Sequence, residues 1–227
     1  MRIRNLFHSG LIGAAVLTCG AMASGREGAL AFIQREHESL AKLLRQPQSP
    51  ARDAQVDTVL SNLVDYDEFA RRSFGQPCPP AHPSCTNHWA TLTTPQRAEV
   101  TPLLKKLIMK TERKNALNML DYDIDYKGER ESDAGSKVRM EARSKLKPRD
   151  PPLQIDYVVV AGGQSWHVID MVTEGSSRAK NYYEQFNRML TNPDQGYPHV
   201  VAKLKENIAK KDMETDATSS SKAKESK

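Results

Sequence analysis

The spacing of apolar residues changes near residue 121, and this change restricts the fold more than any other feature of the chain. Before it, apolar residues recur three and four positions apart, which is the period of an amphipathic helix. After it, they alternate with polar residues, as in a strand with one buried face. The spacing is helical again from about residue 178. Helices, then a meander, then helices predict an α+β fold whose mixed, mostly antiparallel sheet is covered by helices.

The helical stretches of the first half lie at 28–44, 56–63, 66–75 and 94–108. The last of these has Thr94 as its expected N-cap and Pro95 at its first helical position. Pro102 lies inside this stretch and predicts a kink or a late start.

The alternating stretches lie at 121–128, 137–146 and 153–172. In the first, Tyr122, Ile124 and Tyr126 are expected on one face of a strand. The third predicts a hairpin with a two-residue turn at Gly162 and Gly163. Helices at 179–190 and 201–208 then complete the domain.

The two ends of the chain differ from the rest in composition. Arg2 and Arg4, an apolar run at 11–17 and small residues up to Ala23 predict a signal peptide at 1–23, with a run too short to span a membrane. The folded domain is then expected at 24–209. Residues 210–227 contain no aromatic or branched aliphatic residue, which predicts a disordered polar tail.

The formal net charge of the chain is +5, and loss of Arg2 and Arg4 with the signal peptide would lower it to +3. The positive residues are interspersed with acidic ones along the sequence. Nucleic acid is therefore not an expected partner.

Cys78 and Cys85 are the cysteines that remain after export. An oxidising compartment favours a disulfide between them. The spacing with His82 and His88 is also compatible with a zinc site, and this alternative stays open.

The stretch 165–186 contains the residue types of a hydrolase triad. Strict alternation places Val168 and Asp170 on one face, and His167 and Met171 on the other, so His167 and Asp170 would not meet. No G-x-S-x-G motif accompanies the serines, and Ser176 or Ser177 is expected to cap the next helix. We predict no catalytic residues and no metal, although a remote pair such as Glu68 with His88 stays open.

The same stretch carries a set of spaced residues. They read W-x-V-x-D-x-x-x-E-G-x-S and comprise Trp166, Val168, Asp170, Glu174, Gly175 and Ser177. A second set comprises Trp89, Leu92, Thr93, Gln96 and Arg97. With "VDYDEFARRSFG" and "IDYVVV", these segments resemble the MlaC (toluene-tolerance) family, the soluble periplasmic lipid-binding component of the Mla system.

The resemblance implies an apolar cavity between sheet and helices that holds the acyl chains of a phospholipid, with no other cofactor. It implies a non-enzymatic periplasmic carrier in outer-membrane lipid asymmetry. Its partners would be an inner-membrane ABC transporter with an MCE-domain protein, and an outer-membrane lipoprotein complex. The alternatives are an accessory protein of hopanoid or envelope lipid handling, and an enzyme on an NTF2-like cone scaffold.

Period and family position together predict the residues that line the cavity. They are Leu104, Leu107, Ile108, Met140, Tyr157, Val159, Val168, Tyr182 and Phe186. Each of these positions is equally compatible with a packed core, because core and cavity wall both need apolar side chains. Arg178 stands where the family tends to be apolar.

Overall fold

The computed structural model describes residues 27–75, 78 and 85–225, with side chains as far as residue 213. Its first helices are α1 (Ala29–Leu44), α2 (Pro50–Leu63), α3 (Tyr66–Ser73), α4 (His88–Thr91) and α5 (Thr94–Met119). The strands β1 (Tyr122–Ser132), β2 (Gly135–Ser144), β3 (Leu153–Gly162), β4 (Ser165–Thr173) and β5 (Ser176–Ser177) follow, and α6 (Arg178–Thr191) and α7 (Gly196–Glu225) end the fold. The predicted α+β class is confirmed. The expected signal peptide lies outside the described residues.

The strands form one sheet in the order β1-β2-β3-β4-β5, in which each strand pairs antiparallel with the next. An isolated bridge between Val64 and Val168 is parallel. Gly162 pairs with Ser165, so the hairpin turn consists of Gly163 and Gln164, one residue later than predicted. Gly163 has a φ of 60°, a conformation that glycine adopts without steric cost.

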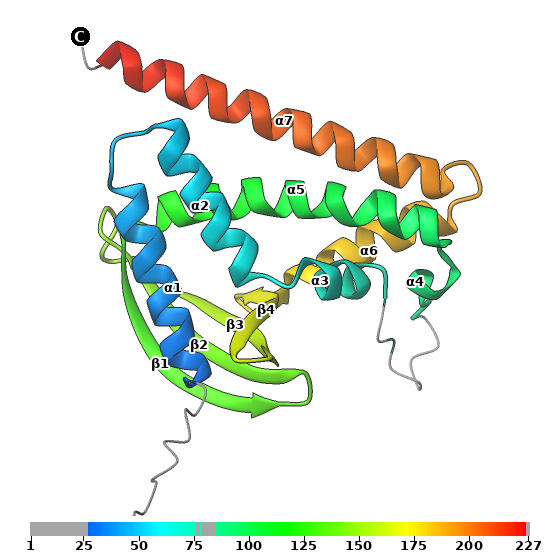
Figure 1. Ribbon diagram of the computed structural model, residues 1–227, viewed down its shortest axis with the longest axis horizontal. Helices are drawn as coiled ribbons and strands as arrows, with labels where there is room; N and C mark the ends of the chain where they lie inside the picture. Colours follow the sequence, from blue (N-terminus) through cyan, green and yellow to red (C-terminus); the bar gives the residue numbers. More distant parts are fainter. Residues whose placement is uncertain (1–26, 76–77, 79–84, 226–227) are drawn as a thin grey trace, which may run out of the picture.

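Helices cover one face of this curved sheet, and α1 crosses its concave side beside β1 and β2 (Figure 1). The first turn of α1 and the residue before its N-cap are each tied to the sheet. The backbone N–H of Leu30 donates to Glu129 Oε2 at 2.5 Å, and Trp166 Nε1 donates to the carbonyl oxygen of Glu27 at 2.7 Å. The N-cap residue Gly28 has no side chain, so Glu129 of β1 provides the acceptor that a capping residue normally supplies.

Local capping explains where the helices α2 to α6 begin. The caps are Ser49 for α2, Asp65 for α3, Asn87 for α4, Thr93 for α5 and Ser177 for α6. Thr93 and Gln96 form a reciprocal capping box, so α5 begins at Thr94, one residue earlier than an N-cap at Thr94 would require. Helix α5 continues through Pro102, and the predicted late start is therefore wrong.

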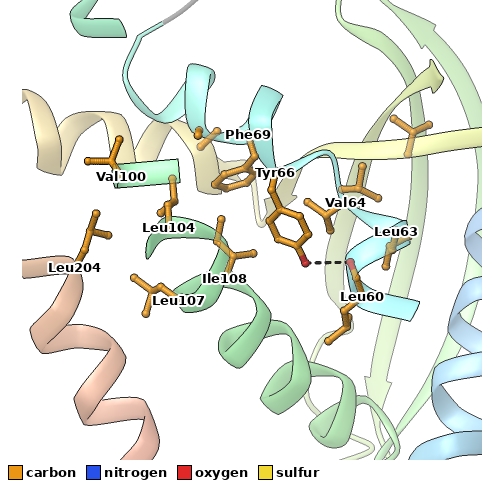
Figure 2. Close-up of a cluster of buried hydrophobic side chains, with 14 of the residues drawn as sticks. Leu60, Leu63, Val64, Tyr66, Phe69, Val100, Leu104, Leu107, Ile108 and Leu204 are labelled. Atoms are coloured by element: carbon orange, nitrogen blue, oxygen red, sulfur yellow. Dashed lines mark hydrogen bonds between the residues drawn. The ribbon is translucent and has the colours of Figure 1, made fainter. Parts of the chain in front are cut away.

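The closed core lies between the first half of α5 and the helices α2, α3, α6 and α7. Figure 2 shows Val100, Leu104 and Leu107 on α5 together with Leu204 of α7, all of them at most 4% exposed. The hydroxyl of Tyr66 lies in the same cluster and donates to a backbone carbonyl of α2 at 3.0 Å. A buried polar atom costs little when it is paired in this way.

Helix α7 extends to Glu225, so the structure does not have the disordered segment predicted at 210–225. Asp212 forms an ion pair with Lys110 of α5 inside that segment. The composition excludes a buried core there, but Lys, Ala, Glu and Met are good helix formers. A helix that is already nucleated by the packed turns around Val200 and Leu204 can therefore continue into a polar sequence.

Cys78 and Cys85 form a disulfide with a Cα–Cα distance of 5.7 Å, between α3 and α4. His82 lies outside the described residues. His88 shares a hydrogen bond with Asn187 through Nε2 at 2.6 Å. Because a disulfide leaves no thiolate to ligate a metal, this geometry does not support the zinc alternative. The described part of the chain contains no group of three or more His, Cys, Asp or Glu residues placed to hold a metal ion.

Candidate functional site

A cavity of about 560 Å³ lies between the sheet and the helices α1, α2 and α5. Its size falls within the range of ~300–1,000 Å³ that is typical of ligand pockets. The surface that it presents is mainly apolar, with few polar groups. A mainly apolar cavity of this kind suits an apolar ligand held by burial.

The sheet wall of the cavity comes from β1, β3 and β4. Residues of one face of β1 and β3 contribute Tyr122, Ile124, Tyr126, Leu153, Ile155 and Tyr157. Side chains of a strand alternate between faces, so the aspartates between the β1 residues point away from the cavity and are exposed. The face expected from the alternation at 121–128 is therefore the face that lines the cavity.

A β-bulge in β4 changes which of its residues reach the cavity. Val168 pairs with Val159 and Asp170 pairs with Val158, which leaves Ile169 as an extra residue. Val168, Asp170 and Met171 consequently all line the cavity. Strict alternation placed Met171 opposite Val168, and that prediction is wrong because it could not anticipate the bulge.

The helical wall comes mainly from the second half of α5, where cavity residues recur at three- and four-residue spacing. They are Ile108, Glu112, Asn115, Ala116 and Met119. Leu60 and Leu63 of α2, and Leu40 and Ala41 of α1, close the other sides. Because residues three and four apart share one face of a helix, the same face of α5 that packs in the core lines the cavity further along.

The residues predicted to line the cavity are divided by the structure into two groups. Ile108, Tyr157 and Val168 line it. Leu104, Leu107, Val159 and Phe186 belong to the main core cluster and Tyr182 packs against it, whereas Met140 is fully buried in a smaller cluster on the same sheet face as the cavity wall. The missed residues belong mainly to α1, α2, β1 and the last turns of α5, with a few more on β3 and β4. The alternation of Tyr122, Ile124 and Tyr126 was the signal that could have identified the β1 residues.

One polar cluster in the cavity wall joins three elements. His37 of α1 lies 2.8 Å from the Tyr126 hydroxyl through Nδ1 and 3.1 Å from the Tyr157 hydroxyl through Nε2. Burial lowers the pKa of His37 to about 4 and raises the pKa of Tyr126 to about 12. Burial also raises the pKa of Tyr157. All three side chains are therefore neutral near pH 7.

A second polar group is the ion pair between Arg178 of α6 and Glu112 of α5, both of which line the cavity. Burial lowers the pKa of Arg178, because desolvation disfavours its charged form. Glu112 supplies the compensating charge. The unexpected Arg178 is thus partnered within the wall and does not introduce an isolated charge.

The serine, histidine and aspartate of the stretch 165–186 do not form a triad. Asp170 accepts hydrogen bonds from Ser177 Oγ at 2.5 Å and from the backbone N–H of Ala179 at 3.0 Å. Ser177 in turn caps α6 by accepting from the N–H of Lys180. His167 shares its hydrogen bond with a backbone carbonyl of α2 instead. These residues form the corner that joins β4 to α6.

The remote pair of Glu68 and His88 is not assembled either. Glu68 forms ion pairs with Arg71 and Arg72 on its own helix. His88 is bonded to Asn187 of α6. Both side chains therefore contribute to the structure around the closed core and not to a shared site.

The fold and the site together define a class: single-domain α+β proteins that enclose an apolar cavity between an antiparallel sheet and its covering helices. The chain belongs to the MlaC family, because the family model described as MlaC protein matches residues 34–206. Among curated proteins, none matches the chain.

A solved structure shares this fold. It is the phospholipid-binding protein from Ralstonia solanacearum in complex with a phospholipid, with a TM-score of 0.64 and 18% sequence identity. The match covers 82% of this chain and 99% of the other. Among the described helices, none is long and apolar enough to cross a membrane.

Proposed function

We propose that this protein binds phospholipid through its acyl chains in the cavity and carries the lipid between membranes. The observation that carries the proposal is the apolar cavity of about 560 Å³ in a member of the MlaC family. Burial of each methylene group contributes about 0.8 kcal/mol, so even part of one acyl chain gives substantial affinity. The phospholipid bound to the Ralstonia solanacearum protein supports the same ligand class.

The proposal includes a location and partners. A lipid cannot cross an aqueous space quickly, because its chains would be exposed to water. A carrier in the periplasm, exported by residues 1–23, would shield the chains on the way. We propose that it receives or delivers lipid at an inner-membrane ABC transporter with an MCE-domain protein, and at an outer-membrane lipoprotein complex. The protein acts as a carrier without catalysis.

Lipid extraction from the purified mature protein tests the proposal. Mass spectrometry after native purification should find phospholipid at close to one molecule per chain. A hopanoid in its place would support the accessory-protein alternative. Protein that is consistently free of lipid would overturn the carrier proposal.

A cavity-filling variant tests whether the lipid binds in the cavity. Ala116 lines the cavity, so Ala116→Phe should occupy space needed by an acyl chain and reduce lipid occupancy several-fold. Ala31→Phe, at an exposed position of α1, is the matched control and should retain lipid. Equal occupancy in the two variants would show that lipid binds elsewhere.

A further inference from the structure

The cluster of His37, Tyr126 and Tyr157 is a polar feature in a mainly apolar wall. The three side chains come from α1, β1 and β3, and all of them line the cavity. They are only partly buried, because each has one side toward the cavity. The ring of His37 packs edge-on against Tyr157, with centroids 5.2 Å apart, so the geometry of the cluster is fixed by packing.

A count of protons in this cluster leaves one donor over. A neutral imidazole has one N–H donor and one acceptor nitrogen. One tyrosine donates its hydroxyl proton to the acceptor nitrogen, and the other accepts from the ring N–H. The hydroxyl that accepts still carries its own proton. This result holds for either tautomer of His37, which only exchanges the roles of Tyr126 and Tyr157.

No further hydrogen bond to either hydroxyl is found among the residues that the structure describes. The leftover proton thus belongs to a group that faces the cavity. A buried donor without an acceptor is costly, whereas a ligand oxygen at this place would satisfy it. The cluster is uncharged, because burial keeps His37 neutral, and a neutral acceptor is therefore a better match than a phosphate or a carboxylate.

We propose that the leftover tyrosine hydroxyl donates a hydrogen bond to the carbonyl oxygen of an acyl ester in the bound lipid. This inference rests on the proposed function and adds a chemical preference to it. An ether-linked lipid of the same shape has no carbonyl and leaves the donor unpaired. A site that hydrogen-bonds its ligand discriminates against an analogue that lacks the partner atom. The protein therefore selects ester-linked over ether-linked chains.

A competition experiment on the mature protein tests the preference. The protein is incubated with vesicles that contain equal amounts of a diester phosphatidylcholine and its diether analogue with the same chain lengths. Lipid extracted from the repurified protein should be enriched in the diester by on the order of fivefold to tenfold. Equal recovery of both lipids, or enrichment of the diether, overturns the inference and leaves the carrier function intact. Recovery of neither lipid counts against the carrier function itself.

Variants of the cluster connect the preference to the hydroxyls. The triple variant His37→Phe, Tyr126→Phe, Tyr157→Phe removes every donor and should bring the ratio of the two lipids close to one. Tyr126→Phe and Tyr157→Phe alone each leave one N–H or O–H donor without an acceptor in the cluster. Each single variant should therefore lose less of the preference than the triple variant does. Tyr197→Phe, whose hydroxyl bonds to α5 outside the cavity, is the control with an unchanged ratio. A triple variant that retains the full preference contradicts the assignment.

A spectroscopic measurement avoids dependence on the folding of the triple variant. Infrared spectra of the wild-type complex with ¹³C=O-labelled diester lipid should show a carbonyl band at lower frequency than the same lipid in dry hydrocarbon. A band at the hydrocarbon frequency shows that no hydrogen bond is made and overturns the inference.

Discussion

The two halves of α5 compare a packed core with a cavity wall on a single helix. In the first half, Val100, Leu104 and Leu107 are almost fully buried against other helices. In the second half, Ala116 and Met119 remain partly exposed, because they face the cavity. The helix and its spacing are the same in both halves, and the difference lies in what stands opposite.

The first half of α5 is closed by α3 and α7, whereas the second half faces α1 and the sheet across a gap. A gap lined by apolar groups lacks the dispersion contacts of a packed core and would tend to collapse. The ties from α1 to Glu129 and Trp166 hold that helix in place against the sheet. The comparison indicates that the closed half contributes most of the packing, and under the proposed function the open half would hold the lipid.

The largest expected effect comes from a truncation in the closed half. Phe186 is 3% exposed and stacks on Phe74 with ring centroids 4.7 Å apart. Phe186→Ala should lower the free energy of unfolding by ~3–5 kcal/mol, measured by urea denaturation. Met119→Ala, in the cavity wall, should cost about 1 kcal/mol or less but weaken lipid retention. Equal losses of stability in the two variants would remove the distinction between the halves.

Acidification should act on the open half through His37. Its pKa is lowered to about 4 by burial, whereas the unfolded chain takes up the proton near pH 6.5. Between these values the unfolded state binds more protons, so the free energy of unfolding falls as the pH falls. The loss is at most about 3 kcal/mol by pH 4. His37→Gln should show a shallower dependence in urea titrations from pH 7 to pH 4, and an unchanged slope would argue against a neutral His37.

Removal of the disulfide should affect the closed half alone. The double variant Cys78→Ser, Cys85→Ser opens a short loop, and chain entropy makes its closure worth about 2–3 kcal/mol. Thr86 in the adjacent segment bonds to Tyr183 of α6, outside the cavity. Lipid occupancy of the folded variant should therefore equal that of the wild type. A reduced occupancy at a temperature where the variant is fully folded would show that the two halves are coupled.

The smallest effect is expected for the ion pair between Lys110 and Asp212, which joins α5 to α7 at the surface. Asp212→Asn should lower the free energy of unfolding by less than about 1 kcal/mol, because water and salt screen an exposed pair. Repeating the denaturation in 1 M salt should abolish the difference from wild type. A larger, salt-independent loss would indicate that this part of α7 contributes to the closed half.

The positions of the helices and strands could be predicted, because the spacing of apolar residues reflects which side of each element is buried. The alternation at Tyr122, Ile124 and Tyr126 identified a strand face, and the serine caps identified the start of α6 at Ser177. Errors of one residue occurred where a reciprocal bond decided the cap, as with Thr93. The bulge at Ile169 left no signal in the pattern of apolar residues, because Val168, Ile169 and Met171 put apolar residues on both faces of β4.

The cavity wall was harder to predict than the fold. Leu104 and Ile108 lie on the same face of α5 and in the same core cluster, and only Ile108 also lines the cavity, because its distance from the neighbouring elements differs. That distance is set by tertiary packing, to which the spacing of residues along one helix is insensitive. The polar cluster was missed for a related reason, since His37 meets its two tyrosines from positions 89 and 120 residues away.

The bond from Glu129 to the first turn of α1 also has a consequence for the order of folding. The two residues that it joins are 99 positions apart, so the acceptor for this helix end exists only after β1 has been synthesised and paired. Contacts of such long sequence separation form late, because the intervening chain must be ordered first. The N-terminal helix is thus the last part of the cavity wall to be fixed. A newly made chain can then enclose a ligand only once its sheet is complete.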